Sequence, residues 1–167
     1  MNRFIFFFVV GILAVHCKHE NTPVEKIYFT GLTMTDENGQ SLGQTDPTDW
    51  GWADTWTIEE KNLFNHGDLP LCPAPPSDSI GVFFMPNPCK EAFFLSFMTP
   101  TGYDWRFKFV DEAFNVLKEV EFLQATPLFN GVHVQTTSFP KDTIRVYYQI
   151  EKNGCALRGH GDILIED

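Results

Sequence analysis

The chain has 167 residues, of which 43% are hydrophobic and 20% charged, and its formal net charge is -10 at pH 7. This acidity argues against nucleic-acid binding, because phosphate contacts need a basic face, and against membrane binding through a basic patch. The length suits one domain with a substantial hydrophobic core.

Residues 1–16 are typical of a signal peptide. Arg3 supplies the positive charge, and the apolar run 4–15, FIFFFVVGILAV, is too short to span a bilayer as a helix. The run stops at Cys17, as in a bacterial lipoprotein signal, although His16 replaces the small residue usual before the cut. We predict a lipid anchor on Cys17 and a location in the cell envelope, at the outer membrane or cell surface. A plain secretory signal and an uncleaved anchor are the alternatives.

Lipidation of the first cysteine leaves three cysteines for disulfide formation. An exported chain can keep disulfides, so one bridge and one free thiol are expected. Cys72 and Cys89 flank a proline-rich passage and can close a short loop, while Cys89 with Cys155 is the alternative pair. No CxxC spacing occurs, and we predict no metal site and no other cofactor.

The polar residues 17–25 read as a tether, and residues 26–79 read as an irregular N-terminal extension of the domain. Residues 26–34 alternate loosely and predict a strand, which runs toward a tight turn at Asn38-Gly39. Further on, Thr57 is followed three positions later by a glutamate, which is the capping-box pattern of a short helix.

Three tryptophans lie within seven residues of this extension: Trp50, Trp52 and Trp56. Exposed, they would form a platform for sugar rings or a partner protein. Buried, they would pack the extension against one end of the domain, and packing is the favoured interpretation. Three aspartates beside them offer oxygen ligands for calcium, but without the EF-hand spacing, so we interpret them as turn residues: Asp46, Asp49 and Asp54.

From residue 80 onward, one apolar strand pattern follows another. Residues 91–98, EAFFLSFM, are apolar on both faces, which predicts a central strand packed on both sides. Residues 104–111 and 142–150 alternate between apolar and polar positions. Asn130-Gly131 and Asn153-Gly154 predict hairpin turns. Together these signals predict an all-β fold, an antiparallel immunoglobulin-like β-sandwich, with one domain over 26–167 and its core over 80–167.

The segment RGHGD contains the main polar cluster of the predicted strands. Arg158, His160 and Asp162 alternate, so they project on one face of an extended strand. Such a cluster can bind an anion, but we favour a role at the solvated end of a hairpin. No set of nucleophile, base and orienting group occurs, and we predict that the protein is not an enzyme.

The segment GVFFMPNPCKEAFFLSF, with Pro86-Asn87-Pro88 at its centre, resembles the opening of the C-terminal sorting-type β-sandwich of many Bacteroidetes exported proteins. WRFKFVDEAFNVLKE is similar to the hairpin that follows in that family, and residues 142–166 are similar to its closing hairpin. The resemblance covers about half of the chain. It implies a β-sandwich fold and a sorting or cargo domain associated with type IX secretion.

The leading functional hypothesis is a non-enzymatic lipoprotein of the cell envelope that serves as a structural or interaction module. Its expected partners are the membrane, through the lipid, and a protein or a glycan, but no nucleic acid. The alternatives are a binding module that uses the tryptophan platform and a type IX secretion-associated domain.

Overall fold

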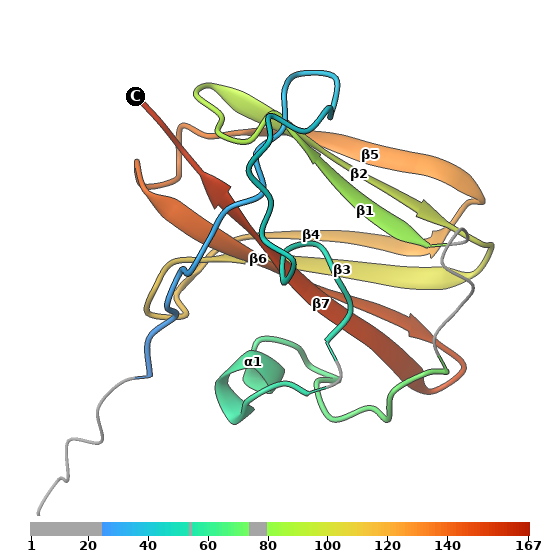
Figure 1. The fold of residues 1–167 in the computed structure, drawn as a ribbon. Helices are drawn as coiled ribbons and strands as arrows, with labels where there is room; N and C mark the ends of the chain where they lie inside the picture. Colours follow the sequence, from blue (N-terminus) through green and yellow to red (C-terminus); the bar gives the residue numbers. More distant parts are fainter. Residues whose placement is uncertain (1–24, 54, 74–79) are drawn as a thin grey trace, which may run out of the picture.

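The computed structural model describes residues 25–53, 55–73 and 80–167, so Cys17 and the signal segment lie outside the described residues. Seven strands form two facing antiparallel sheets (Figure 1). They are β1 Gly81–Met85, β2 Ala92–Thr99, β3 Tyr103–Val110, β4 Val116–Ala125, β5 Leu128–Gln135, β6 Thr143–Lys152 and β7 Cys155–Leu164. The sheet orders are β1-β2-β5 and β4-β3-β6-β7, which confirms the predicted antiparallel β-sandwich.

The core lies between the two sheets. Side chains at alternate positions of β3 and β6 point inward, as the sequence pattern predicted. On the facing sheet, the inward positions of β2 are equally buried. The fully buried inward residues of these three strands are Phe93, Leu95, Phe97, Trp105, Phe107, Phe109, Ile144, Val146, Tyr148 and Ile150.

Of the three predicted Asn-Gly turns, the two expected between strands of the sandwich core have different outcomes. Asn153-Gly154 joins β6 to β7 with positive φ at both residues, 52° and 79°, so this turn is confirmed. The turn at Asn130-Gly131 is wrong, because both residues lie inside β5 and pair with β2. Gly131 is needed for close packing instead, since a β-carbon there would lie 2.4 Å from the ring of Phe94.

The N-terminal extension contains one short helix, α1, Ile58–Asn62. Its capping box is complete: the Glu60 backbone N–H donates to the Thr57 hydroxyl at 3.3 Å, and the Thr57 N–H donates to the Glu60 carboxylate at 2.7 Å. This confirms the predicted helix.

The strand predicted over 26–34 is wrong. This segment pairs with a loop rather than with a strand, because the Ile27 N–H donates to the carbonyl of Glu112, between β3 and β4, at 2.8 Å. The turn that follows does form, with Gly39 at φ 77°, and short backbone pairing crosses it, as in the Thr35–Ser41 bridge and the bond from the Leu42 N–H to the Met34 carbonyl.

The extension covers the free edge of β7, as the blue-to-green trace beside β7 in Figure 1 shows. Exposed edges are templates for unwanted pairing, and covering them prevents it. The backbone N–H groups of Trp50, Ala53 and Cys72 donate to β7 carbonyls at 2.7–2.9 Å. Beyond them Asn87, from the Pro-Asn-Pro segment, accepts from the Leu164 N–H at 3.0 Å through its side-chain oxygen.

Candidate functional site

The two sheets differ in what lies on their outer faces. On the four-stranded sheet, the outer face of β6 and β7 is largely polar and is covered by the extension, whereas Glu119 and Glu121 of β4 stay exposed. The outer face of the three-stranded sheet is apolar and remains partly exposed.

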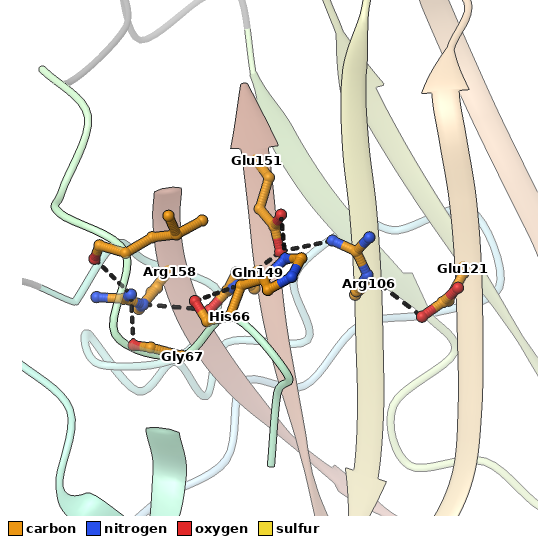
Figure 2. A network of polar contacts seen from close by, with 8 residues as sticks. His66, Gly67, Arg106, Glu121, Gln149, Glu151 and Arg158 are labelled. Carbon is orange, nitrogen blue, oxygen red and sulfur yellow. Dashed lines mark hydrogen bonds and ion pairs between the residues drawn. The ribbon is translucent and has the colours of Figure 1, made fainter. Parts of the chain in front are cut away.

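Arg158, on the outward side of β7, fastens the loop that follows α1. Its buried guanidinium donates to the carbonyls of Gly67 at 2.5 Å and Leu69 at 2.7 Å, and to the Gln149 side chain at 3.3 Å (Figure 2). Gln149 donates in turn to the carbonyl of His66 at 3.1 Å. All three of these acceptors belong to the chain itself.

Glu151, on β6, is the second centre of the network in Figure 2. Its carboxylate accepts from Arg106 at 2.5 Å and Gln149 at 2.8 Å, and it lies 3.1 Å from Nδ1 of His66. Burial opposes its ionisation, but the hydrogen bonds from Gln149 and His66 and the charge of Arg106 outweigh burial and lower its pKa. Arg106 also reaches Glu121 at 3.3 Å, so the network extends across the sheet to β4.

A second buried ion pair lies at the other end of β7. The Arg145 guanidinium donates to both oxygens of the Asp162 carboxylate at 2.7 and 2.8 Å. Next to it, the Asp49 carboxylate accepts from the backbone N–H groups of Thr33 at 2.8 Å and Asp162 at 3.0 Å. Burial, reinforced by the nearby charge of Asp162, raises the pKa of Asp49 to about 6.

Arg158, His160 and Asp162 do share one face of β7, but their expected place at a solvated hairpin end is wrong. The extension covers this face, and each side chain contacts another part of the chain. The His160 ring lies 5.8 Å from the ring of Tyr147, and burial lowers the pKa of this histidine.

The tryptophan platform is also wrong, because the three indoles do not share an exposed surface. Trp56 is 7% exposed and stacks on Phe64 with 5.2 Å between ring centroids. It belongs to a small apolar cluster between the extension and the outer face of the four-stranded sheet. Its role is packing, as the favoured interpretation predicted.

Trp50 fills a space at the edge of the sandwich. It stacks on Phe84 of β1 at 4.9 Å and occupies the place of a side chain at Gly161, where a β-carbon would lie 2.3 Å from the indole. Trp52 is 38% exposed and stands edge-on to Tyr148 at 5.7 Å. Trp52 is therefore the most exposed of the three indoles, while Trp50 is partly buried and Trp56 is buried.

Both predicted disulfide pairings are wrong, since Cys72 is bonded to Cys155 and Cys89 is a buried free thiol. Cys72 lies at the start of β7 because its N–H donates to the carbonyl of Ala156. Cys89 pairs instead with Ile165, just past the far end of this ten-residue strand, about 30 Å away. Sequence spacing alone does not show this separation.

The aspartates of the extension serve as turn and contact residues. Asp46 accepts from the N–H and hydroxyl of Thr48 at 2.8 and 2.7 Å, a local turn bond. Asp49 holds the extension to β7, and Asp54 lies outside the described residues. Across 25–53, 55–73 and 80–167, no group of three or more His, Cys, Asp or Glu side chains is placed to hold a metal ion.

The outward side of β1, β2 and β5, which we call the bare face, has three cross-strand rows. Phe83 is 43% exposed and Phe129 is 71% exposed, with 6.3 Å between their ring centroids. Small residues lie between them at the centre of the face. The rows are Gly81, Met98 and Phe129; Phe83, Ser96 and Gly131; and Met85, Phe94 and His133.

The third row forms part of a groove at one end of the bare face. The groove has a volume of about 1010 Å³, and the loop around Asn38 makes its opposite wall. Met85, Phe94 and His133 lie along its sheet side, and Leu42 faces them from the loop. Charged residues also line it: Asp36, Glu37, Lys90, Glu91 and Glu166. A groove of this size, with apolar walls and a few charged groups, suits a ligand.

No protein-family model, curated protein or solved structure matches the chain. The resemblance to the sorting-type domain therefore stays a prediction. Among the described residues, no helix is both long and apolar enough to cross a membrane.

The bare face was missed by sequence reasoning, although its signal was present. The two apolar faces of residues 91–98 predicted a strand packed on both sides. One face does pack in the core, where Phe93, Leu95 and Phe97 are fully buried. The other face stays partly open, so the second apolar face marked a surface rather than a second core.

Proposed function

We propose that the protein is a non-enzymatic lipoprotein of the cell envelope whose domain binds a partner protein through the bare face. The observation that carries this proposal is the pair of exposed aromatic rings, Phe83 and Phe129, on a sheet face where each of the three rows contains a phenylalanine. Contiguous exposed apolar surfaces of this kind are typical of interaction sites.

The contrast with the covered outer face of β6 and β7 supports the bare face as the binding surface. The extension packs on the polar outer face of β6 and β7. Its Gly67 carbonyl accepts from Arg158, its His66 lies 3.1 Å from the Glu151 carboxylate, and its Asp49 accepts from the Asp162 backbone N–H. These charged groups are engaged in holding the chain together, which favours a structural role over catalysis. The bare face has no comparable cover within the described residues, so its apolar side chains are available to another molecule.

The proposed anchor is lipid on Cys17. An acidic domain would be repelled by anionic headgroups, so a covalent lipid is the favoured means of membrane attachment. Mass spectrometry of the mature N-terminus tests this part. A lipid mass on Cys17 is expected, whereas an unmodified N-terminus at another residue would contradict the anchor.

Site-specific photo-crosslinking in the producing cells tests the bare face. A photoreactive phenylalanine analogue replaces Phe129 in one variant and Ile58 in another, since Ile58 of α1 is similarly exposed, at 70%, but far from the bare face. We expect one discrete protein adduct from position 129 and none from position 58. Equal adducts at both positions, or none at position 129, would contradict the proposal.

A further inference from the structure

Resting on the proposed function, we infer that the groove at the end of the bare face binds a peptide segment that carries lysine or arginine beside apolar side chains. The bare face would contact the body of the partner, and the groove would receive this segment. The apolar walls of the groove account for the apolar side chains of such a segment, and its charged rim accounts for the lysine or arginine.

The walls of the groove suit apolar side chains of modest size. Met85 and Phe94 provide the sheet side, and Leu42, which is 58% exposed, faces them from the loop wall. The Phe94 ring lies 4.8 Å from the ring of His133 at an interplanar angle of 44°.

The rim of the groove is acidic and suits a cation. Asp36 accepts from the backbone N–H groups of Asn38 and Gln40, both at 2.8 Å, and the bond from Gln40 in particular lowers its pKa. Its carboxylate is therefore held in place and ionised. Within the described part of the chain, the carboxylates of Glu37 and Glu91 have no ion-pair partner, so both are free to meet a cation.

The cationic side chains at this end of the groove are already engaged. Lys90 donates to the carbonyl of Asp167 at 2.6 Å, and Lys141 donates to the carbonyl of Glu166 at 2.6 Å. Lys90 is the one lysine among the lining residues, against four carboxylates. A second copy of this acidic chain would be repelled here, whereas a cationic segment would be attracted.

The test uses a synthetic peptide of alternating lysine and valine with a central phenylalanine, labelled for fluorescence anisotropy, and the full domain. We expect saturable binding that weakens as salt rises, because exposed charges are screened. Replacing lysine by glutamate throughout the peptide should abolish binding. Binding of neutral oligosaccharides at the groove, with none of the cationic peptide, would overturn the inference in favour of a glycan site.

Matched variants separate the groove from the general acidity of the protein. Glu37→Lys with Glu91→Lys should weaken peptide binding at least tenfold. Glu25→Lys with Glu119→Lys changes the net charge equally, far from the groove, and should change binding less than twofold. Equal losses in both variants would show that only the overall charge attracts the peptide, which overturns the inference.

A second pair of variants tests the apolar wall. Leu42→Ser should weaken binding about fivefold, while Leu123→Ser, at a residue 62% exposed on β4, should not. Peptide failure combined with a discrete crosslink at position 129 would overturn the groove inference and leave the proposed function standing. Peptide binding without a crosslink at position 129 would overturn the proposed function and leave the groove inference standing.

Discussion

The outer faces of the two sheets have opposite polarity and opposite cover. β6 and β7 present charged and polar side chains outward, and the extension lies on them and accepts hydrogen bonds from Gln149 and Arg158. β1, β2 and β5 present phenylalanine and methionine outward, and these remain partly exposed. Polarity alone would therefore assign cover to the wrong face.

Polar contacts determine where the extension docks on β7. Polar partners must match in position, because a buried donor or acceptor without a partner is costly. The bonds of Arg158 to two loop carbonyls and of Asp49 to two backbone N–H groups fix one register of the extension on β7. An apolar face makes no such demand, so it can accept different partners.

The disulfide should give the largest effect on the covered side. Replacing Cys72 and Cys155 by alanine removes a crosslink between residues that are 83 positions apart in the sequence. The loss should lower the free energy of unfolding by about 4 kcal/mol. Urea denaturation of both forms measures it. Cys89→Ala is the control for a lost cysteine side chain without a lost bridge. A double variant no less stable than the control would show that the extension docks without the bridge.

Much of the fold could be predicted from the sequence because strand alternation is a local signal. The inward positions of β3 and β6, the capping box of α1 and the Asn153-Gly154 turn all follow from residues near one another in the chain. The cover of β7 could not be predicted in this way. Its contacts join Ala53 to Arg158 and Cys89 to Leu164, across separations that periodicity does not encode.

Arg158→Met should give the next largest effect. The change keeps the aliphatic length but leaves the carbonyls of Gly67 and Leu69 and the Gln149 side chain without their donor, at a cost of about 3 kcal/mol. Lys118→Met, at an exposed site, should cost less than about 0.5 kcal/mol. Proteolysis of the native protein should then cut first near residue 67 in the arginine variant. Equal stability of the two variants would contradict a fastening role.

The candidate site was only partly readable from the sequence, for a physical reason. Tryptophans attract attention as binding residues, but Trp56 is drawn into packing by Phe64 and Tyr147. The apolar second face of β2 gave a real signal, yet a pattern cannot tell whether such a face meets the same chain or another one. Only the position of the extension in the structure shows that this face is left open.

Asp49 should make the covered side sensitive to pH. Its pKa rises from 3.8 to about 6 on folding, so folding takes up a proton between these values. Its contribution to stability is therefore present at low pH and lost as pH rises through about 6. Between pH 5 and pH 7 we expect this contribution to fall by about 1 kcal/mol, allowing for partial exposure. The difference in pH dependence between the protein and Asp49→Asn isolates it, and identical profiles would contradict it.

The smallest effect is expected on the bare face, and it gives the sharpest form of the comparison. Phe129→Ala removes a ring that is largely exposed, so the free energy of unfolding should change by less than about 0.5 kcal/mol. Phe64→Ala removes a ring of the same type that is buried beneath the extension, and should cost about 3 kcal/mol. Denaturant titration of both variants measures the contrast. A large loss from Phe129→Ala would mean that the bare face stabilises the isolated domain; near-neutrality would leave partner binding as the reason for its aromatic rings.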